Sequence, residues 1–179
     1  LRQRVEDDAF DPTASAHYEM CNITIITTGK MPIWTPSFEY YQAGCTSCNS
    51  GCAKCIKWDS ATRNLTVMGK INLENCAGYG TGTPFSATGT TANTLVYGAK
   101  NEVINYTGKG TIYFGDLDVR FHGDILTTAY PSVNAVGFIT GGEMFMGESA
   151  QLNMMALFYG EDRIKIDKQT NIAGTVITN

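Results

Sequence analysis

Apolar and polar residues alternate along much of the carboxyl-terminal part of this chain. After Gly115 the alternation is strict, with Leu117, Val119 and Phe121 on one face of the segment and polar residues between them. Side chains that alternate with a period of two are typical of a β-strand with one buried face. We therefore expect short strands, separated by glycine-containing turns, over residues 108–179.

A short phrase recurs within this region. It consists of a glycine, an acidic residue, two further residues and an apolar residue, and it begins at Gly115, Gly142 and Gly160, which are 27 and then 18 positions apart. Recurrence at roughly twenty-residue steps predicts stacked rungs, because one rung is too small to bury its own apolar face. The pattern predicts a mainly β protein with β-solenoid-like stacked strands over 95–179.

The preceding part of the chain also favours strands. Residues 20–28 are rich in β-branched residues and predict a strand. Residues 56–59 and 64–68 flank a four-residue connection and predict a β-hairpin. Residues 77–94 are rich in glycine and threonine and predict a long loop. We accordingly expect an N-terminal β-rich region over 1–94, with a β-hairpin or sheet and a cysteine-rich loop, and a solenoid-like region over 95–179.

Aromatic residues are concentrated just before the cysteines, at Trp34, Phe38, Tyr40 and Tyr41. Ordinary packing in the core and at its rim accounts for such a segment. Exposed aromatic rings would alternatively form a platform on which a carbohydrate stacks.

The chain has six cysteines, an even number that suits disulfides and an oxidising environment. The disulfide candidates are Cys21, Cys45, Cys48, Cys52, Cys55 and Cys76, and six cysteines allow fifteen pairings, among which the sequence does not choose. The four at 45–55 form a doubled CxxC, so a tetrathiolate zinc site on Cys45, Cys48, Cys52 and Cys55 is an alternative. An iron–sulfur cluster or redox-active thiols form a third interpretation.

The polar face of the segment after Gly115 carries Asp116, Asp118, Arg120 and His122. Alternating charge on a solvated outer face keeps an exposed strand soluble. The same groups would serve a β-helical enzyme acting on polysaccharide, a lyase or a glycosidase, with Asp116 and Asp118 as the acids and Arg120 binding a substrate carboxylate.

Composition and charge exclude several classes of protein function. The 43% hydrophobic content is enough for a core, and the net charge of −4 argues against a general nucleic-acid binder. The sequence contains no phosphate-cradling glycine loop, no GxSxG and no HExxH motif. We expect no cofactor and no catalytic residues.

The runs 151–160 (QLNMMALFYG) and 164–177 (IKIDKQTNIAGTVI) resemble the C-terminal domain of PilX-type proteins, which are associated with type IV pili. Residues 108–113 resemble the lead-in to the first rung of that domain, so the resemblance covers about 100–179. It implies a minor pilin-like subunit whose partners are other pilus subunits.

Together these patterns predict an extracellular or cell-surface protein with a structural role in assembly or attachment, and not an enzyme. The expected partners are other subunits of a pilus or surface filament, further copies of the chain, and a surface or polysaccharide ligand. A metal-stabilised interaction module built on the cysteine cluster is the remaining alternative.

Overall fold

The computed structural model describes residues 8–15, 23–24, 33–34, 37–76, 94–97, 101–147 and 151–179. These residues form strands, with one short 3₁₀ helix, η1 (Pro12–Ser15), and the predicted mainly β, solenoid-like fold is confirmed. The first strands along the chain are β1 (Ile23–Thr24), β2 (Ile33–Trp34), β3 (Phe38–Tyr41), β4 (Cys55–Asp59) and β5 (Asn64–Asn72). Those that follow are β6 (Thr94–Tyr97), β7 (Val103–Thr107), β8 (Lys109–Tyr113), β9 (Asp118–Phe121), β10 (Asp124–Leu126), β11 (Ala135–Thr140), β12 (Glu143–Met146), β13 (Leu152–Met154), β14 (Leu157–Gly160), β15 (Arg163–Ile166), β16 (Thr170–Ile172) and β17 (Thr175–Thr178).

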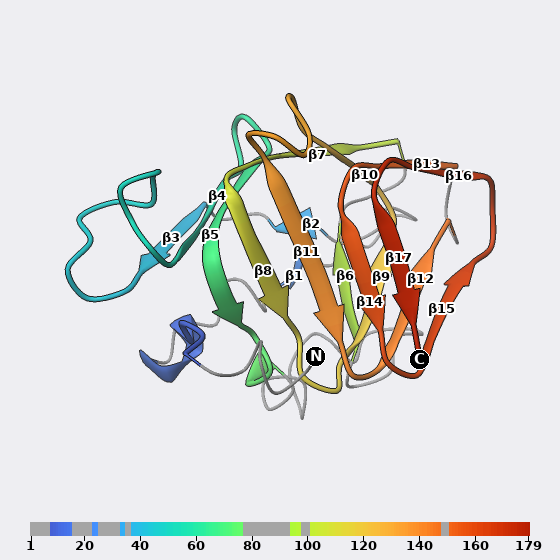
Figure 1. Ribbon diagram of the computed structural model, residues 1–179, viewed down its shortest axis with the longest axis horizontal. Helices are drawn as coiled ribbons and strands as arrows, with labels where there is room; N and C mark the ends of the chain where they lie inside the picture. Colours follow the sequence, from blue (N-terminus) through green and yellow to red (C-terminus); the bar gives the residue numbers. More distant parts are fainter. Residues whose placement is uncertain are drawn as a thin grey trace.

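Parallel pairing arranges the strands from β5 to β17 in three ladders. The first ladder runs β5-β7-β10-β13-β16, the second runs β5-β8-β11-β14-β17, and the third runs β6-β9-β12-β15. The chain visits the three ladders in turn, so β7, β8 and β9 form one rung and β10, β11 and β12 form the next. Figure 1 shows the second ladder in front, with its strands side by side from β5 to β17. The result is a β-solenoid whose rungs are joined by main-chain hydrogen bonds.

The core lies between the ladders and consists of columns of inward side chains from successive rungs. Phe138 is fully buried and stacks on Phe114 and Phe158, with ring centroids 6.4 and 5.7 Å apart. Phe121, from the third ladder, meets the edges of Phe138 and Phe158 at 5.1 and 5.4 Å. Edge-to-face and offset stacking are the favoured arrangements of aromatic rings, so these four side chains form the centre of the core.

The chain turns from the first ladder to the second at glycines in neighbouring rungs. Gly69 lies inside β5, where that strand leaves β7 for β8, and has a φ of +66°. Gly108, between β7 and β8, has a φ of +99°, and a Cβ atom there would lie 2.3 Å from the carbonyl oxygen of Val67. A side chain would be both strained and obstructed at this corner.

The N-terminal end of the solenoid is covered by antiparallel pairing. β3 pairs with β4, and β4 pairs with the first half of β5, from Asn64 to Met68. Phe10 lies beside the second half of β5, where its N–H donates to the carbonyl of Lys70 and its carbonyl accepts from the N–H of Asn72, both at 2.9 Å. The expected β-hairpin is therefore present as β4 and β5, and it closes one end of the stack.

Some details differ from the sequence-based expectations. Met144 stands opposite Val119 and Glu143 opposite Arg163, so the third ladder repeats after 25 and then 20 residues. The recurring glycine phrase is thus out of register with the rungs by two residues, because turns of unequal length separate the strands. His122 is 4% exposed and lies beyond the end of β9, so it does not share an outer face with Arg120.

The predicted division at residue 94 is crossed by the ladders, since β5 pairs with both β7 and β8. The loop predicted at 77–94 lies outside the described residues except for Thr94, which begins β6. Of the strand predicted at 20–28, the structure describes β1, which pairs with β2.

Candidate functional site

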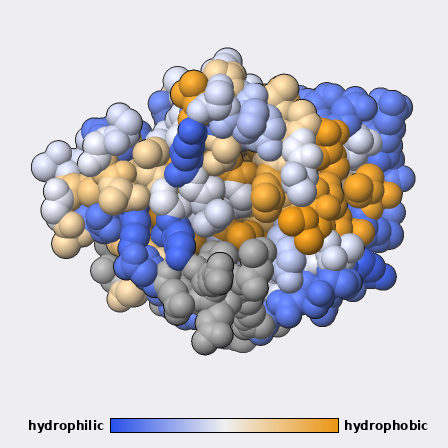
Figure 2. Space-filling view, viewed as in Figure 1, coloured by the Kyte–Doolittle hydropathy of each residue, from blue (hydrophilic) through white to orange (hydrophobic). Residues whose placement is uncertain are grey.

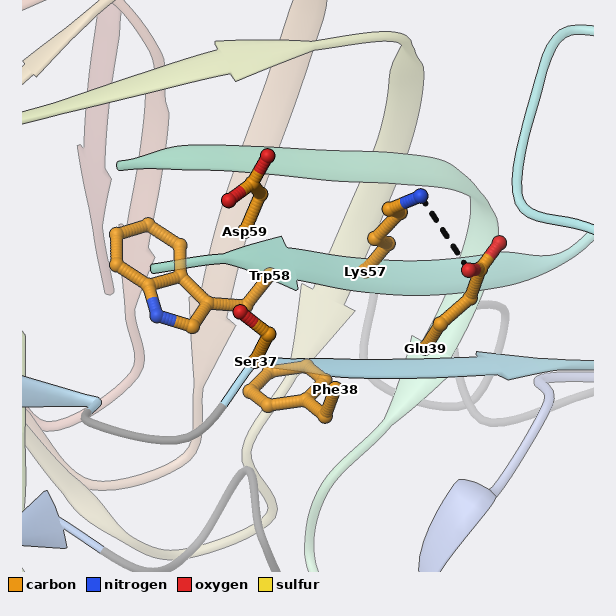
Figure 3. A pocket seen from close by; sticks show the side chains of 6 residues that line it. All are labelled: Ser37, Phe38, Glu39, Lys57, Trp58 and Asp59. Carbon is orange, nitrogen blue, oxygen red and sulfur yellow. Dashed lines mark ion pairs between the residues drawn. The ribbon is translucent and has the colours of Figure 1, made fainter. Parts of the chain in front are cut away.

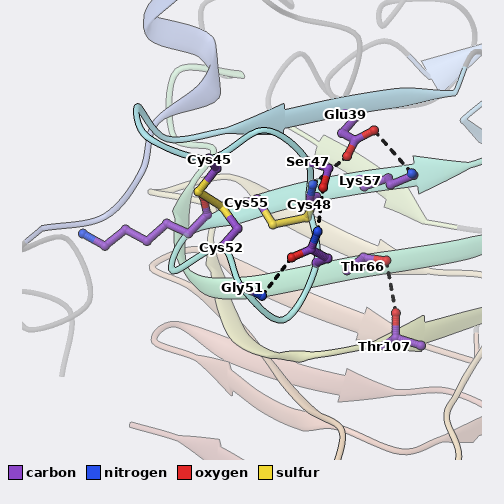
Figure 4. The surroundings of a disulfide bond; sticks show 12 residues. Glu39, Cys45, Ser47, Cys48, Gly51, Cys52, Cys55, Lys57, Thr66 and Thr107 are labelled. Atoms are coloured by element: carbon purple, nitrogen blue, oxygen red, sulfur yellow. Dashed lines mark hydrogen bonds and ion pairs between the residues drawn. A yellow bond between two sulfur atoms is a disulfide. The ribbon is translucent and has the colours of Figure 1, made fainter.

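Two disulfides join the cysteines of the loop between β3 and β4. Cys45 bonds to Cys52 and Cys48 bonds to Cys55, with Cα atoms 5.5 and 5.4 Å apart (Figure 4). The two crosslinks interlace, because the first member of each pair precedes the second member of the other. A loop with little apolar content is thereby held in one conformation, since each crosslink removes chain entropy from the unfolded state.

Hydrogen bonds attach the crosslinked loop to the hairpin beneath it. The N–H of Cys48 donates to the Glu39 carboxylate at 2.6 Å, and that carboxylate pairs with the Lys57 ammonium group at 3.3 Å (Figure 4). Within the loop, the N–H of Gly51 donates to the side chain of Asn49 at 2.8 Å. The loop is therefore a defined surface that projects from the covered end of the solenoid (Figure 1).

The disulfides decide among the interpretations of the cysteine cluster. A tetrathiolate zinc site or an iron–sulfur cluster needs four thiolates, and both sulfur pairs are bonded to each other. Cys76 is also disulfide-bonded, whereas Cys21 lies outside the described residues. In the part of the chain that the structure describes, no three His, Cys, Asp or Glu side chains gather to hold a metal ion.

A solvent-open groove of about 470 Å³ separates the crosslinked loop from the solenoid. Its lining comes from the loop, from β5, β7 and β8, and from the connection between β10 and β11; the residues are Cys48, Asn49, Ser50, Thr66, Met68, Thr107, Gly108, Lys109, Val133 and Asn134. Five of these residues carry a hydroxyl or amide group and one is a cation, whereas most of the accessible lining surface is apolar. We refer to this feature as the loop groove. It offers a few hydrogen-bonding groups on a mostly apolar surface, a combination that suits a ligand with both polar and apolar faces.

The floor of the loop groove is a pair of threonines on neighbouring rungs. The hydroxyls of Thr66 and Thr107 lie 3.1 Å apart (Figure 4), and the side-chain amide of Asn64 donates to both at 3.3 Å. Asn134 closes one side, where it accepts from the N–H of Gly108 at 2.8 Å and donates to the carbonyl of Thr128 at 2.9 Å. The polar wall is thus held in place by its own hydrogen bonds.

The sequence-based search missed the loop groove. The only related sequence feature is the motif Asn-x-Thr, which occurs at Asn22 and, beside the groove, at Asn64 and Asn105. The motif is common in a chain rich in asparagine and threonine, and a separation of 41 positions is unlike the shorter spacing of the later rungs. The structure places the two copies in register, with Asn64 opposite Asn105 and Thr66 opposite Thr107.

Part of the aromatic segment belongs to the core, in which Phe38 is buried and the half-buried Tyr40 packs against it. Phe38 and Trp58 are 6% and 1% exposed and line a shallow pocket of about 230 Å³ between β3 and β4 (Figure 3). Tyr41 is 40% exposed at the end of β3, and nothing is described of the Trp34 side chain. The packing interpretation therefore holds for Phe38.

The residues of the predicted acidic face lie in different environments in the structure. Asp116 is exposed in the turn before β9, whereas Asp118 is half-buried and accepts a hydrogen bond from the N–H of Glu143 at 3.0 Å. The Arg120 guanidinium lies over the Phe145 ring, 4.1 Å from its centroid. Asp118 and Arg120 thus stabilise contacts between β9 and β12, and the use of this face by an enzyme stays a prediction.

Within the described residues, no helix has the length and apolar character needed to cross a bilayer. Comparisons of the chain with protein-family models, with curated proteins and with solved structures found no match.

Proposed function

We propose that this protein is an extracellular structural subunit that attaches a surface filament to a polar ligand such as a polysaccharide. The solenoid would serve as a stiff spacer and the loop groove as the contact surface. The observation that carries the proposal is the crosslinked loop, which stands at one end of the stacked rungs and forms one wall of the groove.

Three properties support this role. A stack of rungs with a continuous aromatic and aliphatic core is stiff without any cofactor. Disulfides persist in oxidising compartments, which include the cell exterior. Hydroxyl and amide side chains at fixed positions are suited to the hydroxyl groups of a sugar, because each can both donate and accept a hydrogen bond.

The resemblance of residues 100–179 to PilX-type proteins adds a more specific proposal, namely that the filament is a type IV pilus and the protein a minor pilin-like subunit. Fractionation of the source cells tests this part. The protein should be recovered with filaments sheared from the cell surface, and it should be lost from that fraction when filament assembly is disrupted. Recovery with the cytoplasmic contents would contradict the proposal.

Binding of the purified protein to cell-surface polysaccharides tests the role of the loop groove. Thr107→Val removes a groove hydroxyl with little change in shape, and we expect binding weaker by about three- to tenfold, the effect of one lost hydrogen bond. Thr128→Val is the matched control, because Thr128 is exposed outside the groove lining. Equal binding by both variants would exclude the loop groove as the contact surface.

A further inference from the structure

The cation of the loop groove is Lys109, the first residue of β8. It follows the corner at Gly108, where the chain passes from the first ladder to the second, and its side chain is exposed. On the next rung Lys109 lies opposite Ala135, whose methyl side chain is too short to cover it. The ammonium group therefore stands on the solenoid side of the groove, where a ligand can reach it.

The surroundings of Lys109 leave its positive charge uncompensated. Among the described residues no carboxylate forms an ion pair with it, and none of the ten lining residues is acidic. Glu39, which accepts from the N–H of Cys48 beneath the crosslinked loop, is itself paired with Lys57 at 3.3 Å (Figure 4). The groove thus carries a local positive charge, although the whole chain has a net charge of −4.

The neighbouring amide groups already have hydrogen-bond partners in the protein. The amide of Asn64 donates to both threonine hydroxyls of the floor, and Asn134 bonds to the N–H of Gly108 and the carbonyl of Thr128. The ammonium group of a lysine has three donors and no acceptor. Its strongest partner is a negatively charged oxygen, because charge-assisted hydrogen bonds are stronger than neutral ones.

Most of the remaining accessible lining is apolar. Met68 packs against the disulfide cluster of the loop, and Val133, in the connection between β10 and β11, is 60% exposed. A pyranose ring has C–H groups on its faces and hydroxyls at its rim, so it suits an apolar surface that hydrogen-bonding groups border. A bare anion such as phosphate has no apolar face and would leave this part of the lining in water.

We infer that the loop groove binds the hexuronic acid residues of an acidic polysaccharide. The Lys109 ammonium group pairs with the sugar carboxylate, and Met68 and Val133 lie against the ring. The inference rests on the proposed function, in which the groove is the contact surface, and names the class of polysaccharide. The groove volume of about 470 Å³ lies in the range of small-ligand sites, about 300–1,000 Å³. Because the groove is open to solvent, a long chain can lie across it.

The net charge of the whole chain makes this recognition selective. A chain with a net charge of −4 repels polyanions in general, so attraction at long range does not explain the binding of an acidic polymer. A neutral polysaccharide leaves Lys109 without an anionic partner, and a polyanion without sugar rings leaves the apolar lining uncovered. Both should therefore bind more weakly than a polymer that combines rings with carboxylates.

Calorimetric titration of the purified chain with polygalacturonate, alginate and hyaluronate tests the inference. Each polymer is measured beside its methyl ester, which keeps the sugar rings and removes the charge. We expect at least one of the three acids to bind at least about threefold more tightly than its ester, the effect of one exposed ion pair. Equal binding of acid and ester for all three polymers, or no binding of any, would overturn the inference.

Replacement of the cation locates the binding site. Lys109→Gln should weaken binding of the acid form by about three- to tenfold and leave the ester form unchanged. Lys109→Glu should weaken it further, because it sets a like charge beside the carboxylate. Lys168→Gln is the matched control, since Lys168 is an exposed lysine between β15 and β16, outside the groove lining. Equal losses in Lys109→Gln and Lys168→Gln would assign the effect to net charge and contradict the inference.

Polyglutamate separates recognition of the sugar from recognition of its charge. It carries carboxylates on a peptide chain and has no sugar ring, so we expect it to bind more weakly than the preferred polyuronate. Equally tight binding of polyglutamate would show a site for anionic polymers in general and overturn the assignment to a sugar. Circular dichroism of each variant distinguishes a lost contact from a lost fold.

The inference and the proposed function fail separately. If neutral and acidic polysaccharides bind equally and Thr107→Val still weakens both, the groove remains the contact surface and the specificity for uronic acids is removed. If uronate binding depends on Lys109 but the protein is absent from sheared filaments, the class of ligand remains and the filament role is removed.

Discussion

Phe138 lies at the centre of the core, in contact with the rings of Phe114, Phe121 and Phe158. It is fully buried, so truncation to alanine leaves a cavity lined by the rings of Phe114, Phe121 and Phe158. We expect Phe138→Ala to lower the free energy of unfolding by about 3–5 kcal/mol. Urea unfolding measures this, with Val133→Ala as an exposed control that should stay within about 0.5 kcal/mol of the natural sequence.

Also at the residue scale, Asp59 organises the turn between β4 and β5. Its carboxylate accepts hydrogen bonds from the N–H groups of Ala61 and Thr62 at 2.9 and 3.3 Å. A side-chain hydrogen bond with Thr62, followed by these backbone bonds, holds the pKa of Asp59 below its ordinary value of 3.8. A lowered pKa means that the charged carboxylate stabilises the folded protein above 3.8 and that this contribution is lost as the pH falls further.

The matched variant for this pH effect is Asp59→Asn, which keeps an acceptor oxygen but cannot ionise. We expect the natural protein to melt at a higher temperature than the variant near neutral pH. The difference should shrink as the pH falls below about 4. Melting curves across this range check the expectation, and a constant difference would assign the stabilisation to something other than the charge.

At the scale of elements, the loop between β3 and β4 depends on its two crosslinks more than on packing. Cys55 is fully buried at the start of β4, whereas Cys45 is half-buried on the loop. Replacing both Cys45 and Cys52 by serine should cost roughly 2–3 kcal/mol, the chain entropy released by opening such a short ring. Replacing Cys48 and Cys55 should cost more, because both of these serines would stand at buried positions, whereas in the first variant only the serine at position 52 would.

Unfolding in urea and limited proteolysis distinguish these two variants. Loss of the crosslink between Cys45 and Cys52 should make the loop sensitive to protease, while the hairpin of β4 and β5 stays intact. Equal sensitivity of the natural protein and both variants would show that the crosslinks do not determine the conformation of the loop.

At the scale of the whole molecule, the solenoid is a nearly one-dimensional stack in which each rung contacts its neighbours. Local stability should therefore follow the burial of each rung. We expect amide hydrogen exchange to be slowest in β8 and β11, and fastest in β16 and β17, where the described side chains are mostly exposed. Uniform protection along the ladders would contradict the one-dimensional description.

Features that depend on neighbouring residues were open to prediction. The alternation of Val119 and Phe121 predicts a strand with a buried face, and both residues are fully buried in β9. The hairpin of β4 and β5 was predicted because its two strands flank a short connection. Met144 and Met146 share one face of β12 and lie in the core, in accord with the period of a strand.

Features that depend on contacts between residues far apart in the sequence could not be predicted. The first strand of the second ladder pairs Gly69 with Gly110 across 41 positions, and no local pattern indicates that spacing. The cysteine pairing was one of fifteen for the same reason, since composition counts thiols but does not bring their Cα atoms to within bonding distance. The loop groove joins a loop, three strands and a later connection, so its residues have no common sequence signal.

The sequence by itself determined that this chain forms stacked β-strands, because period-two alternation and regular glycine turns act over a few residues and predict both the strand and its buried face. Only the tertiary structure decided the register of the three ladders, the crosslinks at 45–55, and the antiparallel strands that cover the N-terminal end of the stack. These depend on which distant strands share main-chain hydrogen bonds, and each strand offers the same donors and acceptors whatever its side chains. The candidate site therefore follows from how the rungs are stacked.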